Sequence, residues 1–165
     1  MAAHSLISVQ KIPVSIEEAW SFYSRPLNLS QITPPYMKFE VISRHHGEGL
    51  YAGQLFEYKL RPFLGIPLYW MTEITHVRAS AYFVDEQRKG PYSLWQHQHH
   101  FKPIDGGVEM TDIVHYKNPL WFLGELAHIL FVKKKLRQIF EFRFKKVEEI
   151  FGQWPGGQSP GIEMN

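Results

Sequence analysis

The order in which strand-like and helix-like segments follow one another constrains the fold of this chain more than any other feature of its sequence. Between residues 37 and 116, six stretches alternate apolar and polar residues with a period of two, and one long stretch of helical periodicity follows them. Alternation of this kind predicts half-buried strands, and strands that follow one another closely usually pair as antiparallel neighbours. The six predicted strands are 37–41, 54–60, 67–76, 79–87, 93–102 and 108–116.

The segment before these strands predicts one more strand and two short helices. Residues 5–12 form the first predicted strand, which Pro13 ends. Ser15 and Glu18 fit a capping box, in which the serine caps the first turn of a helix and the glutamate reaches back. A second short helix is expected over 27–31, ending before Pro34, because a proline restricts the residue in front of it.

The last long segment, 122–151, predicts one helix of about 30 residues, or about 45 Å at the rise of an α-helix. Its apolar residues recur at steps of three and four, so one stripe faces a core. The predicted class is therefore α+β, with a curved seven-stranded antiparallel sheet wrapped around a long C-terminal helix. A straight helix cannot touch a curved sheet along its whole length, so we expect a cavity between them. Residues 1–151 are predicted to form a single domain, and the Gly- and Pro-rich 152–165 a flexible tail.

Composition excludes several classes of protein. The 165 residues contain no cysteine, which excludes disulfides, thiolate metal sites and a cysteine nucleophile. The formal net charge of +2 argues against a general nucleic-acid binder. The most apolar stretch, 120–132, is too short to span a bilayer, and the first residues lack the pattern of a signal peptide, so a cytoplasmic location without a transmembrane segment is expected.

Aromatic residues make up 15% of the chain, which indicates either a bulky core or a cavity lined by rings. On strand 93–102, the alternation places Trp95, His97, His99 and Phe101 on one face, which we assign to the interior. A turn at 104–107 then sets Asp112 opposite His99, or opposite His97 if the register slips by two. The candidate ligand-binding residues are Phe56, Tyr58, Trp70, Phe83, Asp85, Gln87, Trp95, His97, His99, Asp112 and Phe140.

The polar members of this set form a predicted cluster of Asp85, Gln87, His97, His99 and Asp112. A turn at 88–91 would bring Asp85 near Trp95 and Phe83 near His97. The cluster has three interpretations: side chains that satisfy one another, anchors for a ligand head group, or an acid/base site with His97, His99 and Asp112 as catalytic candidates. The same three residues also form a two-His, one-carboxylate set, but nothing else in the sequence supports it, so neither a metal nor a cofactor is expected.

Four local motifs carry a resemblance to a known family: FVDEQ at 83–87, GPY at 90–92, WQHQHHF at 95–101 and GVEMTD at 107–112. The chain resembles the START/birch-pollen-allergen (SRPBCC) superfamily, in the branch related to polyketide cyclase/dehydrase and lipid-transport proteins. This resemblance implies a helix-grip fold and a cavity that binds a hydrophobic small molecule or lipid. It implies no reaction, since such proteins include carriers, receptors, cyclases and chaperone activators. A cyclase- or dehydratase-like enzyme that uses the His/Asp cluster is the alternative, a protein-interaction module is a third, and the oligomeric state stays open.

Basic residues are concentrated in the predicted long helix. Seven of the 18 lysines and arginines lie within 133–146, and apolar residues that include Trp121 and Phe122 precede them. This arrangement predicts either a solvated helix face, which we favour, or peripheral contact with anionic lipid, with Trp121 and Phe122 at the interface.

Overall fold

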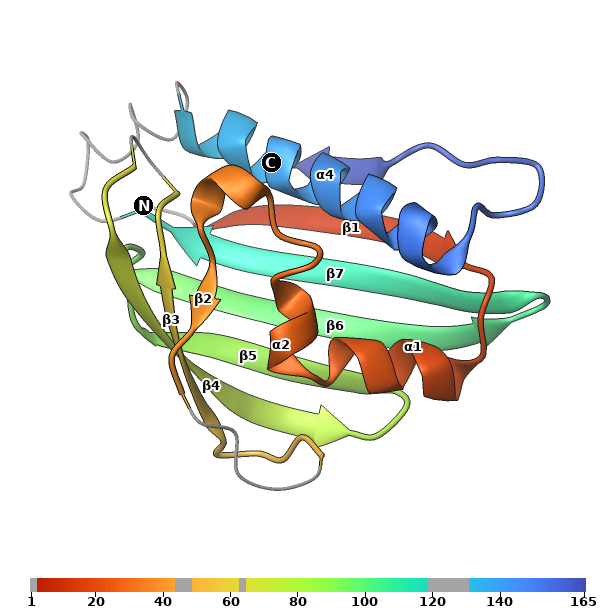
Figure 1. Cartoon of the computed structure of the whole chain (residues 1–165), viewed down its shortest axis with the longest axis horizontal. Coiled ribbons are helices and arrows are strands. Elements are labelled where there is room, and N and C mark those ends of the chain that lie inside the picture. Colours follow the sequence, from red (N-terminus) through yellow and green to blue (C-terminus); the bar gives the residue numbers. More distant parts are fainter. Residues whose placement is uncertain (1–2, 44–48, 63–64, 119–130) are drawn as a thin grey trace.

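The computed structural model describes residues 3–43, 49–62, 65–118 and 131–165. Their strands form one antiparallel sheet in the order β2-β3-β4-β5-β6-β7-β1-β8, so that β2 to β7 follow one another as a meander and β1 returns beside β7 (Figure 1). The expected α+β class is confirmed, with eight strands in place of seven. The strands are β1 His4–Ile12, β2 Glu40–Val41, β3 Leu55–Leu60, β4 Leu68–Arg78, β5 Tyr82–Lys89, β6 Leu94–Ile104, β7 Gly107–Lys117 and β8 Gly161–Met164.

The helices are α1 Ile16–Tyr23, α2 Pro26–Leu29, the 3-10 turn η1 Pro35–Met37 and α4 Lys133–Phe151. Ser15 caps α1 as predicted, because its Oγ accepts a hydrogen bond from the Glu18 amide at 3.2 Å. The first part of the predicted long helix, 122–130, lies outside the described residues. Within the described ranges, no helix is both long enough and apolar enough to cross a membrane.

Of the predicted strand 37–41, only 40–41 form a strand, β2, because η1 extends to Met37. The turn ends at Lys38, whose φ of +44° places it in the left-handed region, so extended backbone begins only at Glu40. Pro34 and Pro35 favour this outcome, because proline fixes its own φ and lacks the amide hydrogen that a sheet ladder needs. The other predicted strands are present with shifts of a few residues at their ends.

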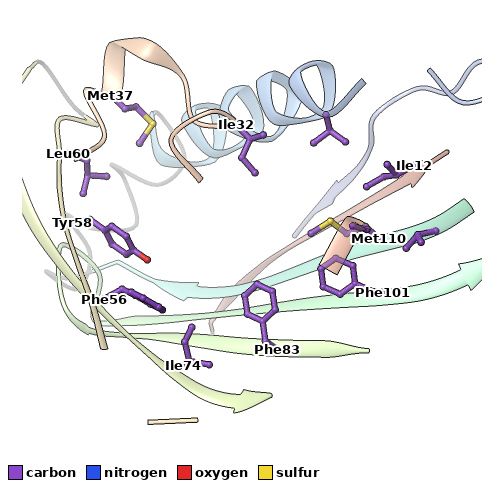
Figure 2. Packing of buried hydrophobic residues seen from close by; sticks show 13 residues of the cluster. Ile12, Ile32, Met37, Phe56, Tyr58, Leu60, Ile74, Phe83, Phe101 and Met110 are labelled. Carbon is purple, nitrogen blue, oxygen red and sulfur yellow. The ribbon is translucent and has the colours of Figure 1, made fainter. Parts of the chain in front are cut away.

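The core lies between the concave face of the sheet and the helices, which all cover that face (Figure 1). Along α4, Leu136, Phe140, Phe144 and Val147 are buried at the spacing that the sequence predicted. Rings from β3, β5 and β6, among them Phe56, Phe83 and Phe101, point from the sheet into the same interior (Figure 2). A side-chain hydrogen bond fixes the helix over the sheet, because the buried Gln10 amide donates to the Phe144 carbonyl at 2.9 Å.

The C-terminal segment is the main correction to the predicted fold. Residues 161–164, expected to belong to a flexible tail, form β8 and pair with β1 from Leu6↔Met164 to Val9↔Gly161. Two basic side chains of α4 hold this strand, since Lys133 donates to the Met164 carbonyl at 3.2 Å and Arg137 to the Ile162 carbonyl at 3.5 Å. The prediction failed because β8 is bound largely through its backbone, which composition does not report.

We predict that β8 contributes to stability through Ile162, which is 9% exposed and packs with Leu6 and Val114. Ile162→Ala should lower the free energy of unfolding by about 2 kcal/mol, the lower range for truncating a buried isoleucine. The matched control is Ile66→Ala, since Ile66 is 55% exposed. Urea denaturation of both variants measures the difference, and equal midpoints would show that the segment does not fold onto β1.

Candidate functional site

A cavity of about 190 Å³ lies between the concave face of the sheet, α4 and the segment that follows α1. Its walls are mainly apolar and come from every strand between β3 and β6. Of the residues predicted to bind a ligand, all but Gln87 and Asp112 line it. Those that do are Phe56, Tyr58, Trp70, Phe83, Asp85, Trp95, His97, His99 and Phe140.

Aromatic rings form much of the wall. Trp70, Tyr92 and Trp95 contact one another, with ring centroids 5.2 Å apart for Trp70 and Trp95 and 4.9 Å apart for Tyr92 and Trp95. Across the wall, the Phe39 and Tyr58 rings lie 4.9 Å apart. Burial raises the pKa of both Tyr58 and Tyr92, so their hydroxyls stay protonated at neutral pH. The aromatic part of the cavity is therefore uncharged and suits an apolar ligand.

Two histidines and two aspartates form a compact cluster at the sheet side of the cavity. Asp112 Oδ1 lies 2.8 Å from His97 Nε2 and forms a hydrogen bond with it. The same oxygen lies 2.9 Å from His99 Nδ1, but the angles of this contact do not fit a hydrogen bond. Asp85 Oδ1 lies 3.0 Å from His99 Nε2 and 3.8 Å from His97 Nδ1. Each imidazole therefore lies between the same two carboxylates, and the two rings are 3.8 Å apart.

The register of the strands brings these four residues together. In the β6–β7 pair, Asp112 lies opposite His99, as the sequence predicted in its first alternative. In the β5–β6 pair, Asp85 lies opposite His97 and Phe83 opposite His99, two residues away from the predicted register. This correction makes the cluster tighter than expected, since Asp85 now reaches both imidazoles.

Gln87 accounts for the difference in register, and it does not join the cluster. Its side-chain amide donates to the Tyr92 carbonyl at 2.6 Å, and its oxygen accepts from the Tyr92 amide at 3.3 Å. These bonds stabilise a β5–β6 connection wider than the tight turn assumed at 88–91, which moves the pairing by two residues. Gln87 thus shapes the loop beside the cavity and is not among the residues that line it.

The residues of the cluster differ in the direction of their pKa shifts and therefore in their charge. Burial alone would raise the pKa of Asp112, but the contacts from His97 and His99 outweigh burial and hold that pKa well below its usual range. Burial, helped by the neighbouring His99, lowers the pKa of His97. For His99, burial is outweighed by the carboxylates of Asp112 and Asp85, which raise its pKa. The arrangement favours a charged His99 between two carboxylates, next to a neutral His97.

Asp112 and Asp85 have different positions relative to the cavity. Asp85, His97 and His99 line it, whereas Asp112 lies behind the two histidines and is 5% exposed. Asp112 is therefore a positioning residue for the two rings. The sequence grouped it with the ligand-binding residues because strand alternation gives the face of a side chain but not its depth.

Arg143 lines the cavity, although the sequence pattern placed it on the basic face of the helix. Its side chain is 11% exposed, its Nη1 lies 3.8 Å from Asp112 Oδ2, and its guanidinium carbon lies 4.8 Å from the centre of the Phe140 ring. A signal for this position was present, because Arg143 is three residues after Phe140 and four before Val147, in step with the buried stripe. Tyr23 is a second lining residue that the sequence did not single out.

The same cluster has the donor types of a metal site. Asp85, His97 and His99 each offer one ligand atom, and these atoms lie within 4.8 Å of one another. Two histidines and one carboxylate are a common set for a divalent transition metal, and Asp112 would orient both rings from behind. The sequence had considered Asp112 as the carboxylate of such a set, whereas the structure turns Asp85 toward the cavity.

Three residues of the predicted basic surface of the long helix have two specific roles. Lys133 and Arg137 bind the backbone of β8, and Arg143 faces the cavity. Trp121 and Phe122, the apolar residues of the predicted membrane contact, lie outside the described residues.

Comparison with known families identifies the relatives of this fold. Residues 12–153 match the family described as polyketide cyclase / dehydrase and lipid transport. The chain belongs to this family. No curated protein matches it.

Solved structures with the same fold come from bacteria and plants. Protein CV1439 from Chromobacterium violaceum has a TM-score of 0.70 and 8% identity, over 91% of this chain and 98% of that chain. Protein TTHA0849 from Thermus thermophilus has a TM-score of 0.64 and 18% identity, over 88% and 94%. Major latex-like protein 151 from Panax ginseng has a TM-score of 0.66 and 13% identity, over 92% and 99%. These likenesses and the family match confirm the helix-grip fold and the START/birch-pollen-allergen superfamily.

We predict that the two cavity histidines titrate on opposite sides of their ordinary pKa of 6.5, His99 above it and His97 below it. Because folded His99 binds its proton more tightly than the unfolded chain does, its protonation stabilises the fold below pH 6.5, and this contribution is lost as the pH rises through its folded pKa. Asp112→Asn should lower both histidine pKa values, because it removes the shared anion. NMR titration of labelled histidines measures these changes.

Asp105→Asn is the matched control for this titration, since Asp105 is exposed in the β6–β7 turn. It should leave both histidine curves unchanged. Two histidines that titrate together near 6.5, with no response to Asp112→Asn, would contradict the arrangement described for the cluster.

Proposed function

We propose that this protein binds a hydrophobic or amphipathic small molecule, such as a lipid, in the cavity between the sheet and α4, and that it carries or sequesters that molecule. The observation that supports this most is the cavity itself, which has mainly apolar walls and one group of buried polar side chains. Ligand sites of proteins commonly combine an apolar lining with a few polar groups that orient the ligand.

The arrangement of the rings supports a ligand over a simple core. Protein interiors are close-packed, and space left unfilled among buried side chains lowers stability. Here the wall residues Phe56, Tyr58 and Phe83 point into the interior below α4 (Figure 2), yet a cavity remains in front of them. A bound apolar molecule would supply the missing contacts.

The family supports the same proposal, since its description includes lipid transport. The family description names no particular ligand, so the residues of the cavity wall have to indicate which ligand binds. The cytoplasmic location, the peripheral membrane contact and the protein-interaction role inferred from the sequence stay predictions.

We predict that filling the cavity weakens ligand binding. Thr72 lines it and is 4% exposed, so Thr72→Phe places a ring in the space for the ligand. The affinity for the neutral fluorescent probe N-phenyl-1-naphthylamine should fall at least about 10-fold, a loss of about 1.4 kcal/mol of binding free energy. Fluorescence titration measures this, and solvent extraction with mass spectrometry tests whether the wild-type protein carries a ligand when purified.

Thr111→Phe is the matched control, because Thr111 lies on β7 between the inward-facing Met110 and Asp112 and points to the opposite face of the sheet. It should bind the probe like the wild type. If the wild type binds no apolar probe and yields no extracted ligand, the proposed function is wrong.

A second candidate is an enzyme that moves a proton on the bound molecule, as a cyclase or dehydratase does. The observation that favours it is His97, which lines the cavity and whose Nε2 is hydrogen-bonded to Asp112. Burial lowers the pKa of His97, so the ring is neutral at neutral pH. With its proton on Nε2 and directed at Asp112, the ring has its Nδ1 lone pair available as a general base.

We predict that, if this second candidate is correct, the wild-type protein exchanges a carbon-bound proton of its co-purified ligand with deuterium from heavy water, or removes water from that ligand. Mass spectrometry of the extracted ligand over time measures both. His97→Gln should abolish the change and still retain the ligand, whereas His100→Gln, on the outer face of β6, should not alter it. A ligand whose mass stays constant in the wild type would reject the enzyme and leave the binding function in place.

A further inference from the structure

Arg143 is a positive charge placed inside an apolar cavity. It lies on α4 directly before Phe144, whose carbonyl accepts the hydrogen bond from Gln10, so the backbone beside it is fixed against β1. Its guanidinium carbon lies 4.8 Å from the centre of the Phe140 ring, a cation–π distance that holds the group along the cavity wall. The position of the charge is therefore fixed by the backbone of α4 and by the ring of Phe140.

Two nitrogen donors of this guanidinium group lack a hydrogen-bond acceptor among the described residues. Arg143 Nε and Nη1 are buried and have no hydrogen-bond partner within the part of the chain that the structure describes. Asp112 Oδ2 lies 3.8 Å from Nη1, which allows charge attraction but is too long for a hydrogen bond. Asp112 cannot neutralise Arg143 fully, because the same carboxylate already contacts both His97 and His99.

A buried donor without an acceptor is costly, and the cost is larger for a charged group. An arginine stays protonated in any protein environment, so Arg143 cannot remove the cost by losing its proton. An acceptor has to come from the contents of the cavity, and an anion satisfies the guanidinium better than a neutral carbonyl does, because a charge-assisted hydrogen bond is stronger.

Two further residues of the cavity wall carry a charge of the same sign as Arg143. Arg25 and Lys135 also line it, and among the described lining residues Asp85 is the one carboxylate. Asp85 is bonded to His99 at 3.0 Å, so its charge is partly offset. The wall as a whole therefore favours a negative group on the ligand.

We propose that the ligand is an apolar molecule that carries a carboxylate, and that Arg143 binds this carboxylate inside the cavity. The proposal rests on the proposed binding function and names the chemistry of its ligand. A singly charged group fits the site better than a doubly charged one, because Arg143 is the buried guanidinium of the described wall, Arg25 is exposed, and the Asp85 carboxylate lies in the same wall.

A pair of probes that differ in one charge tests this assignment. cis-Parinaric acid and its methyl ester share the same fluorescent chain, and only the acid carries a carboxylate. The wild type should bind the acid about 10- to 100-fold more tightly than the ester, the range expected for hydrogen bonds to a charged group. Arg143→Gln should remove most of this preference and leave the affinity for the ester within about twofold.

Two further variants make the result specific. Lys145→Gln removes an exposed positive charge from the same helix and should leave the preference for the acid unchanged. Arg143→Lys keeps a positive charge at the site and should retain part of the preference, which guards against misfolding of Arg143→Gln. Circular dichroism shows whether each variant is folded.

The possible outcomes separate the two proposals. If the wild type binds acid and ester equally, or if Arg143→Gln weakens both by the same factor, the assignment of the carboxylate is wrong and the binding function stands. If neither probe binds and N-phenyl-1-naphthylamine does not bind either, the proposed function itself fails. A preference for the acid that only Arg143 variants reduce would establish the inference.

Discussion

The contact between α4 and the concave face of the sheet is the interaction on which the rest of the structure depends. Leu136, Phe140 and Phe144 anchor the helix, and the Gln10 amide holds its backbone at one point. Because the sheet is curved, this contact closes the space over the strands without filling it. The cavity and the place of Arg143 in its wall both follow from where this helix lies.

The buried cluster of two aspartates and two histidines lies in the space that α4 closes over the sheet. Charged groups inside an apolar space are tolerated when each has a partner, and the two aspartates and two histidines partner one another. Beside the cluster, Arg143 has two buried nitrogens, Nε and Nη1, without a hydrogen-bond partner among the described residues. This difference is the basis for our proposal that Arg143, and not the mutually paired carboxylates, binds the charged group of a ligand.

Particular residues show how far prediction from the sequence reached. The inward face of β6 was predicted correctly, and Asp112 lies opposite His99, the first of the two registers that the sequence left open, because the tight β6–β7 turn defines the register. The β5–β6 register was wrong by two residues, because the Gln87 side chain stabilises a wider loop. The strand β8 and the inward direction of Arg143 were missed, since both depend on where α4 lies relative to the sheet.

The sequence by itself determined the type and order of most elements from β1 to α4, the buried face of β6 and the aromatic lining of the interior, because hydrophobic periodicity is a local property of the chain. Only the tertiary structure decided which atoms meet. It brought Asp85 to both histidines, placed Asp112 behind them, and directed the guanidinium of Arg143 into the cavity. Depth, register and helix position arise from contacts between residues far apart in the sequence, and no local pattern records them.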